Sequence, residues 1–213
     1  MRRRRTHICG IMVIMLVMIS LFTYPQSIQA KSNNAQIKKL VGKMESYEYK
    51  LLSDGKNKVK LTKTEMAKAA ALSLNRNEKN QIKVAEFGGD DIYKISNKKL
   101  KVAGKNLFGT TISSKNLPTT CQKDSLCDVY RKKDGTVVVS VANIETETDY
   151  VVHSIKITKK SGNTYQVKKN LYYGYWGSNN GQSNYQIVYQ VKPSSKSVYG
   201  YKIAGMKITA IEK

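Results

Sequence analysis

The sequence predicts a single α+β domain in which N-terminal helices pack on a curved antiparallel meander sheet. Apolar residues recur at three- and four-residue spacings in the first half of the chain, the period of a helix, and alternate singly from Leu126 onward. Helices are therefore expected at about 35–107 and a sheet at about 126–212, within a domain spanning 31–213. With 213 residues, 40% hydrophobic and 24% charged, the chain can build one core and is too polar for a membrane bundle.

The first thirty residues have the pattern of a secretory signal peptide. Four arginines, Arg2 to Arg5, precede the apolar run 8–22, and a more polar stretch ends at Ala30. Cleavage between Ala30 and Lys31 is expected, which would make the protein secreted and extracellular. An uncleaved membrane anchor is the alternative, although the apolar run is shorter than the roughly 20 residues that a spanning helix needs.

Three helices are expected in the first half of the chain. The first lies within 35–53, and its apolar stripe consists of Ile37, Leu40, Val41, Met44, Tyr47 and Leu51. The second begins after Thr62, which has the spacing of a capping box with Glu65 three residues later. The third follows Ser96 and stops near Gly109.

The hairpins of the sheet are marked by turn residues. Asp134-Gly135 and Ser161-Gly162 each stand between two alternating segments, as in tight β-hairpins. A third turn lies across 177–181 (GSNNG), and Pro193 ends the strand that follows it. Gly205, inside the last strand, indicates a bulge or bend of the kind that a curved sheet needs.

Cys121 and Cys127 are the two cysteines that remain after removal of the signal, in the stretch TTCQKDSLC. In an exported chain such a pair is expected to form a disulfide, here closing a small loop and stabilising it by about 2–3 kcal/mol. The alternative, a metal site, lacks matching histidine or cysteine ligands elsewhere in the sequence, so no metal is expected.

The charge is strongly positive, with 37 Lys+Arg against 15 Asp+Glu, a formal net charge of +22 and an isoelectric point near 9.8. Residues 1–30 hold four arginines and no acid, so their removal lowers the charge only to +18. Short runs such as Lys168-Lys169 are expected on solvated faces. The excess favours polyanions outside the cell, namely wall teichoic acid, anionic lipid headgroups and extracellular DNA. Only Arg76 and Arg131 follow the signal, which disfavours specific nucleic-acid recognition.

The sequence contains no recognisable catalytic constellation. His153 is the only histidine after the signal, and strand alternation places it on one face with Val151 and Ile155, as for a core or edge residue. Nucleophile-elbow, phosphate-loop and HExxH motifs are absent. The acidic clusters 90–91 and 145–149 are expected in solvated turns, the alternatives being an acid–base pair or a calcium site. The protein is therefore predicted to be no enzyme, with no catalytic residue and no cofactor.

Aromatic residues gather in the last third of the chain, at Tyr165, Tyr172, Tyr173, Tyr175, Trp176, Tyr185, Tyr189, Tyr199 and Tyr201. Alternation explains most of them as the packed face of a sheet. Tyr172, Trp176 and the amides Asn179 and Asn180 of the GSNNG turn are less easily placed in a core. These four are the predicted binding residues, suited to stacking on sugar rings or on a peptide.

Three stretches, YKISNKKLKVAGKNLFG, KKDGTVVVSV and SVYGYKIAGMKI, look like those of exported proteins of low-GC Gram-positive bacteria. The order of elements resembles the cystatin-like or nuclear-transport-factor-like α+β roll. In size, signal and element order over residues 60–213, the chain is similar to the secreted inhibitors of cell-wall DL-endopeptidases. The resemblance implies a binding or inhibitory module of the cell envelope, and it carries over no functional residue.

The sequence thus predicts an exported, non-enzymatic module, associated with the cell wall and attracted to its anionic polymers. One alternative is a protein inhibitor of a peptidoglycan hydrolase of DL-endopeptidase type, with a cell-wall enzyme as partner and an exposed loop such as 121–127 or GSNNG as the contact. Another is a small extracellular hydrolase that uses Glu or Asp with Tyr. No specific nucleic acid is expected as a partner, and membrane contact is expected only through an uncleaved signal.

Overall fold

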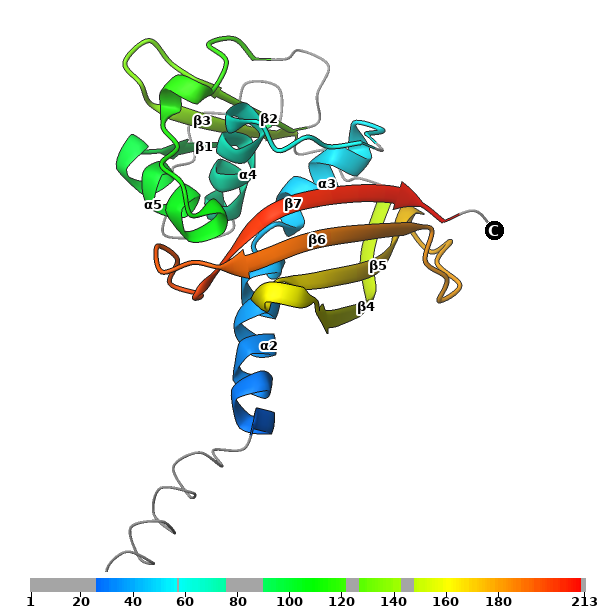
Figure 1. Cartoon of the computed structure of the whole chain (residues 1–213). Helices are drawn as coiled ribbons and strands as arrows, with labels where there is room; N and C mark the ends of the chain where they lie inside the picture. Colours follow the sequence, from blue (N-terminus) through cyan, green and yellow to red (C-terminus); the bar gives the residue numbers. More distant parts are fainter. Residues whose placement is uncertain (1–25, 57, 76–89, 122–126, 143–147, 212–213) are drawn as a thin grey trace, which may run out of the picture. The chain divides into compact units, whose positions relative to one another are not determined.

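Figure 1 shows the computed structural model of the chain, which describes residues 26–56, 58–75, 90–121, 127–142 and 148–211. Within these ranges four helices and two antiparallel sheets form a mixed α+β fold, as the sequence predicts. Residues Gln36–Lys213 make up one compact unit, distinct from Met1–Ala35. None of the helices described is long and apolar enough to span a membrane.

The helices are α2 (Gln26–Gly42), α3 (Glu45–Ser53), α4 (Lys63–Asn75) and α5 (Asn97–Phe108), with short 3-10 turns η2 (Ser114–Asn116) and η3 (Ser161–Asn163). The strands are β1 (Asp90–Ile95), β2 (Cys127–Arg131), β3 (Val137–Ala142), β4 (Thr148–Lys159), β5 (Tyr165–Tyr175), β6 (Tyr185–Pro193) and β7 (Tyr201–Ala210). The turns predicted at Asp134-Gly135, Ser161-Gly162 and GSNNG join β2 to β3, β4 to β5 and β5 to β6.

The strands form two sheets, where the sequence predicts one continuous meander. Their orders are β1-β3-β2 and β4-β5-β6-β7. β1, which comes from the helical half of the chain, pairs along β3, with Ile95 opposite Val137. Because β2 pairs with the other side of β3, β3 has no free edge left for β4. The next strand therefore starts a new sheet.

The helix ends follow the local signals in the sequence. The Ser96 hydroxyl accepts the N–H of Lys99 at 3.3 Å, and Gly109 ends α5 with a positive φ of 64°. At the start of α4 the Thr62 hydroxyl accepts the N–H of Glu65 at 3.2 Å. The predicted boundaries of these two helices are therefore confirmed.

The predicted first helix is interrupted, and its two parts are α2 and α3. The N–H groups of Lys43 and Met44 donate to the carbonyls of Leu40 and Val41, only three residues back, at 3.2 and 3.0 Å. Gly42, a poor helix former, directly precedes this tighter turn. The apolar stripe nevertheless continues through the break, because its six predicted members are all buried.

Two bulges shift the register of the four-stranded sheet. Between β6 and β7 the shift falls at Gln190 and Val191, with Gly205 opposite, which confirms the bend predicted at this glycine. Between β4 and β5 the shift makes His153 the extra residue of its strand. A bulge reverses the phase of alternation in the strand that carries the extra residue. On β4 and on β7, side chains after the bulge therefore point to the face opposite to the one that simple alternation predicts.

The bulge in β4 overturns the predicted face of His153. Val151 lies opposite Tyr172, whereas Ile155 lies opposite Lys169. Tyr172 and Lys169 are an odd number of residues apart on β5, so Val151 and Ile155 lie on different faces of the sheet. His153 therefore does not share one face with both.

The four-stranded sheet has an inner face, which we define by its buried residues Tyr165, Val167, Lys169, Leu171, Ile187, Tyr189, Val191, Ile203, Met206 and Ile208. α3 contacts this face through Tyr49, whose ring centroid lies 6.3 Å from that of Tyr150 and 5.6 Å from that of Tyr173. The packed face that alternation predicts is thus confirmed for Tyr165 and Tyr189, whereas Tyr175, in phase with Tyr165 on β5, is exposed at the end of its strand. In the view of Figure 1 no helix crosses the opposite, outer face of β4, β5 and β6, whereas on β7 the side chain of Lys202 lies close to Gly109 at the end of α5.

Several predicted features lie outside the described residues. These are the signal through residue 25, the side chains of Ala30 and Lys31 at the predicted cleavage site, and the acidic residues Glu145 and Glu147. The backbone of Asp90 and Asp91 is described and belongs to β1. These two aspartates are therefore strand residues, where the sequence predicts a turn.

Candidate functional site

A largely buried polar cluster lies between α3 and the inner face of the four-stranded sheet, and of its four members only Tyr150 is partly exposed. The Glu48 carboxylate accepts hydrogen bonds from the hydroxyls of Tyr150 and Tyr189 and from the ammonium of Lys169. Lys169 also donates to the Tyr150 hydroxyl at 3.0 Å. Both charged side chains are almost wholly excluded from solvent, with 0% of Glu48 and 2% of Lys169 exposed.

The chemistry available to this cluster is limited by its burial. Burial raises the pKa of the Tyr189 hydroxyl well above its ordinary value, and the adjacent Glu48 carboxylate raises it further. Each oxygen of Glu48 already accepts a hydrogen bond, and its charge is paired with Lys169. The cluster therefore joins a helix to the sheet and offers no group to a ligand.

The outer face of the same sheet is polar and basic. Lys156, Lys168 and Lys207 lie in one row across the strands. Lys156 of β4 is opposite Lys168 of β5, and Val188 of β6 lies between Lys168 and Lys207 of β7. Lys192 and Lys202 form a second row, about 14 Å further along the strands. We call these five lysines the outer lysine face.

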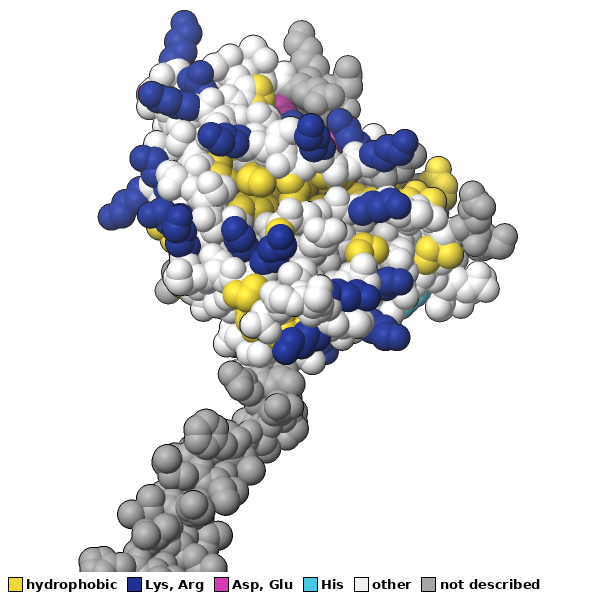
Figure 2. Space-filling model, viewed as in Figure 1, with side chains coloured by type: hydrophobic (Ala, Val, Ile, Leu, Met, Phe, Trp, Pro, Cys, Tyr) yellow, Lys and Arg dark blue, Asp and Glu magenta, His cyan; other side chains and the backbone are white. Residues whose placement is uncertain are grey.

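Two pairs of like charges stand directly opposite each other on this face, Lys156 with Lys168 and Lys192 with Lys202. Directly opposed like charges destabilise a sheet. Within the described part of the chain, none of the five lysines has an ion-pair partner. In the region of the four-stranded sheet, Figure 2 shows Lys and Arg side chains with no Asp or Glu among them. The face is thus a concentration of uncompensated positive charge.

A hydrogen-bonded row of polar side chains lies beside the first lysine row. Asn170 donates to the Ser154 hydroxyl at 3.2 Å and accepts from the side chain of Gln186 at 2.9 Å. The three residues occupy neighbouring strands in register, with Thr209 next on β7. The row therefore presents amides and hydroxyls in fixed positions next to the lysines.

The outer lysine face is a candidate site that is not among the residues predicted from the sequence. Its signal is present in the alternation, because Lys156 stands between Ile155 and Ile157 and is out of phase with them. The prediction that the run Lys168-Lys169 lies on a solvated face is wrong for Lys169, which is buried, and only Lys168 belongs to the outer face. Assigning the lysines to faces required the register of the strands.

The predicted binding residues come together at the turn between β5 and β6. These are Tyr172, Trp176, Asn179 and Asn180; together with Tyr175, which is not among the predicted binding residues, we call them the aromatic tip. Trp176 is 78% exposed and Tyr175 72% exposed, and Asn180 is also exposed. Tyr172 is half-buried and lies on the outer face of β5, in phase with Asn170 and Lys168.

Tyr172 is held in place by the turn that follows it. Its hydroxyl donates to the Ser178 hydroxyl, which in turn donates to the carbonyl of Tyr175 at 2.7 Å, and the Tyr172 oxygen lies 3.3 Å from the same carbonyl. A Cβ atom on Gly174 would lie 2.5 Å from the Tyr172 hydroxyl oxygen. The ring therefore lies over the backbone of Gly174, where only glycine leaves room.

The other side of the turn is tied to β4. The Asp149 carboxylate accepts the N–H of Gly177 at 3.2 Å. The side-chain amide of Asn179 donates to His153 Nε2 at 3.2 Å, and its Oδ1 accepts the backbone N–H of Gly181 at 3.0 Å. His153 thus has its described hydrogen bonds within this turn region, where its other ring nitrogen, Nδ1, lies 2.9 Å from the Ser183 hydroxyl.

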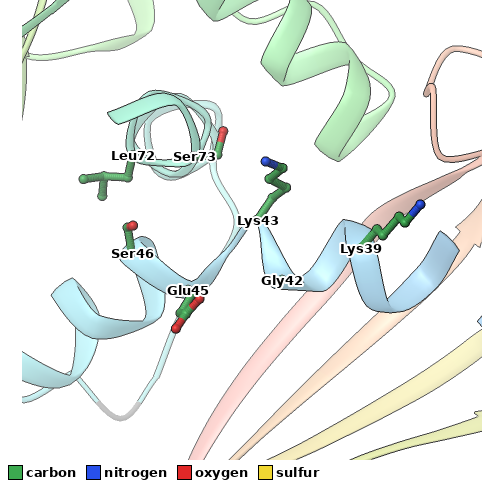
Figure 3. A pocket seen from close by; sticks show the side chains of 7 residues that line it. All are labelled: Lys39, Gly42, Lys43, Glu45, Ser46, Leu72 and Ser73. Atoms are coloured by element: carbon green, nitrogen blue, oxygen red, sulfur yellow. The ribbon is translucent and has the colours of Figure 1, made fainter. Parts of the chain in front are cut away.

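Two hollows elsewhere in the described residues do not gather free charged groups. The first, of about 260 Å³, is shown in Figure 3; Lys43 points toward Ser73 there, whereas Lys39 and Glu45 point away, so only one charged side chain turns toward that hydroxyl. The second, of about 640 Å³, contains Lys68 and Asp128. Lys68 lies 3.6 Å from Glu65, and Asp128 accepts the N–H of Val129, so both are engaged.

The cysteines and metal ligands add no further site. Cys121 is exposed, the side chain of Cys127 lies outside the described residues, and no disulfide is seen in the part of the chain that is described. The Cys121–Cys127 pairing therefore stays a prediction. Among the described residues, no group of three or more His, Cys, Asp or Glu side chains is placed to hold a metal ion.

The arrangement of the candidate site is therefore an exposed sheet face with two rows of lysines, a row of amides and hydroxyls, and an aromatic turn at one end. Such a surface can attract and hold a polyanion by charge and hydrogen bonding. Comparison of the chain with protein-family models, with curated proteins and with solved structures finds no match.

Proposed function

We propose that this protein is a non-enzymatic binding module that holds an anionic cell-envelope polymer on its outer lysine face. The observation that carries the proposal is the presence of two pairs of directly opposed lysines, Lys156 with Lys168 and Lys192 with Lys202. Such pairs weaken the isolated sheet. A local arrangement that opposes stability is expected at a functional position, because a bound polyanion would remove the repulsion.

The type of residue supports diffuse attraction. Lysine presents a compact, strongly hydrated point charge on a flexible stem, whereas arginine recognises individual phosphates or bases with two fixed hydrogen bonds. The outer lysine face contains no arginine. Binding is therefore governed by the release of counterions from the polymer and falls steeply as salt rises.

The test compares two variants with the same loss of charge. Lys156→Gln/Lys168→Gln removes one opposed pair, and Lys98→Gln/Lys101→Gln removes two exposed lysines of α5. Retention on isolated cell walls is measured from low to physiological salt, with walls stripped of teichoic acid as a second substrate. We expect the outer-face variant to lose most of the binding and the α5 variant to resemble the unsubstituted protein.

Three results would contradict the proposal. Equal losses in both variants would mean that net charge, and not this face, controls binding. Undiminished binding to stripped walls in high salt would indicate a protein or neutral glycan partner, as for an inhibitor of a wall hydrolase. Release of soluble wall fragments during the assay would identify an enzyme.

Export to the envelope is part of the same proposal. It is supported by Arg2 to Arg5, the apolar run 8–22 and the small residue Ala30. Mass spectrometry of the protein recovered outside the cells should give an N-terminus at or near Lys31. Recovery only of the full-length chain in membranes would replace secretion with anchoring. The cystatin-like roll is likewise kept as a proposal, supported by the order of helices before an antiparallel meander.

A further inference from the structure

The aromatic tip carries two large side chains that are mostly exposed to solvent. Trp176 and Tyr175 are 78% and 72% exposed, whereas Tyr165 and Tyr189 of the same sheet are buried. Val151, opposite Tyr172 on the outer face, is a third exposed apolar side chain at this end. Clustered exposed apolar side chains on a rigid element commonly mark a contact surface.

The tip is rigid enough to present these rings in a defined way. The carboxylate of Asp149 and the ring of His153, both from β4, bind the backbone and side chain of the turn. The hydroxyls of Tyr172 and Ser178 close it from the β5 side. A turn held at four points loses little conformational entropy when a ligand binds to it.

The tip continues the outer lysine face. Along β5 the outward side chains are Lys168, Asn170 and Tyr172 in succession, and four residues of strand span about 14 Å. A single extended ligand that lies on the lysines can therefore reach the amide row and then the ring of Tyr172. Tyr175 is in phase with the inner face, but its carbonyl and the Ser178 hydroxyl lie at the Tyr172 hydroxyl, so the turn that carries Trp176 lies beside that ring. Charge, hydrogen-bonding groups and flat apolar surface follow one another in a fixed order.

We propose that the aromatic tip binds sugar rings of the same polyanion that the lysines attract, so that the ligand is an anionic glycan polymer carrying phosphate or carboxylate groups. This inference rests on the proposed function. Sugar rings have an apolar face that packs on tyrosine and tryptophan and hydroxyl groups that hydrogen-bond to amides such as Asn170 and Gln186.

The arrangement favours a glycan over a single-stranded nucleic acid. Proteins that bind nucleic acid strands by stacking place aromatic side chains along the charged groove, so that successive bases stack while the backbone follows the cations. Here the outward residues in and between the two lysine rows are Lys, Gln, Thr, Val and Gly, and the rings lie only at one end. Bases held along the lysines would have nothing to stack on.

Trp176 makes the test direct, because it is the only tryptophan in the chain. Its fluorescence is recorded while the full-length protein is titrated with three probes at equal charge concentration: inorganic polyphosphate, which has no rings, polygalacturonate, and single-stranded polydeoxythymidylate. Binding is followed in parallel by sedimentation of the complexes. We expect all three probes to bind in low salt and polygalacturonate to change the Trp176 emission most.

Substitution separates the two contributions. Trp176→Ala is expected to weaken polygalacturonate binding about 2- to 12-fold and to leave polyphosphate binding unchanged. The matched control is Val198→Ala, which removes an equally exposed side chain (74% exposed) from the β6–β7 loop. This control is expected to alter neither. Because Trp176 is exposed, folding of the variant is expected to be intact, and its unfolding midpoint checks this.

The outcomes distinguish the two levels of the inference. If no probe binds, the proposed function itself is wrong. If polyphosphate and polygalacturonate bind with equal affinity, cause no change in Trp176 emission and are unaffected by Trp176→Ala, the lysine face stands and the sugar subsite is refuted. A larger Trp176 emission change with polydeoxythymidylate than with polygalacturonate, together with weaker sedimentation of polydeoxythymidylate with Trp176→Ala, would overturn the glycan in favour of a nucleic acid strand.

Discussion

The ammonium of Lys169 on β5 donates to the carboxylate of Glu48 on α3, and both side chains are buried although the residues are 121 positions apart in the chain. Tyr150 and Tyr189 complete the hydrogen bonding of this pair. Lys168, the neighbour of Lys169, points to the opposite face and is exposed. One lysine thus holds a helix on the sheet while the next belongs to the surface that we propose binds a polyanion.

The first prediction concerns this buried pair. Lys169→Met leaves the Glu48 carboxylate buried without a cation, and the expected cost is about 3–5 kcal/mol of unfolding free energy. Lys68→Met is the control, because Lys68 lies 3.6 Å from Glu65 on a partly exposed helix surface. Its expected cost is at most about 1 kcal/mol. Urea unfolding of the two variants and of the unsubstituted protein measures both changes in unfolding free energy.

A second substitution tests whether the charge of Glu48 causes the loss. In the Lys169→Met background, Glu48→Gln removes the unpaired charge and is expected to recover part of the stability. If Lys169→Met and Lys68→Met cost the same, or if Glu48→Gln makes the first variant worse, the buried charge is not what holds α3 to the sheet.

The second prediction is a loss of stability in alkali. Burial raises the pKa of the Tyr47 hydroxyl well above its ordinary value, and the Glu65 carboxylate, whose oxygen lies 2.5 Å away, raises it further. The folded state therefore keeps this proton at a pH where the unfolded chain has lost it. The stabilisation is complete below about pH 10 and declines as the pH rises above that value.

The measurement is the unfolding free energy as a function of pH in the native chain and in Tyr47→Phe. Above about pH 10 the slope of the variant is expected to be shallower by about 1.4 kcal/mol per pH unit, since one titrating group has been removed. Parallel curves throughout that range would show that Tyr47 ionises as easily in the folded protein as in the unfolded chain.

The third prediction compares two glycines in helices. A Cβ on Gly104 of α5 would lie 2.9 Å from three atoms of the Ile112 side chain, whereas a Cβ on Gly42 of α2 would have nothing within 4 Å. Gly104→Ala is expected to cost about 1–3 kcal/mol through overpacking. Gly42→Ala is expected to stabilise by up to about 1 kcal/mol. The change in unfolding midpoint of each variant is measured by thermal unfolding. A change in the same direction for both variants would contradict the packing argument.

The fourth prediction concerns Cys121 and Cys127. Peptide mapping without reduction of the exported protein should find the two cysteines in one linked pair. Replacing both with serine should lower the unfolding free energy by no more than about 2–3 kcal/mol, because the closed loop is short. Alkylation of both thiols in the exported protein before reduction would show that the pair is not joined.

Much of the fold follows from local signals in the sequence. Ser96 caps the start of α5 and Gly109 ends it. Both act through the backbone of their own turn, so their effect does not depend on what the helix packs against. Asp134-Gly135 specifies a hairpin for the same reason. The tip residues Tyr172, Trp176, Asn179 and Asn180 could also be selected from the sequence, since alternation and turn composition leave them outside the core.

The pairing of strands was decided only by the tertiary structure. β1 pairs with β3, although α5, η2 and β2 lie between them in the chain. No local sequence pattern encodes such a distant pairing. The bulge at His153 likewise reverses the face of everything that follows it on β4. A one-residue shift of this kind moves each side chain between core and solvent.

The sequence by itself determined the excess of lysine, the α+β class and most element boundaries, because composition, periodicity and capping act over a few residues. Only the tertiary structure decided which lysines face each other across strands and which one, Lys169, enters the core. Register and burial bring together residues that are far apart in the chain, and the electrostatic energy of a charge depends on those neighbours more than on its own segment.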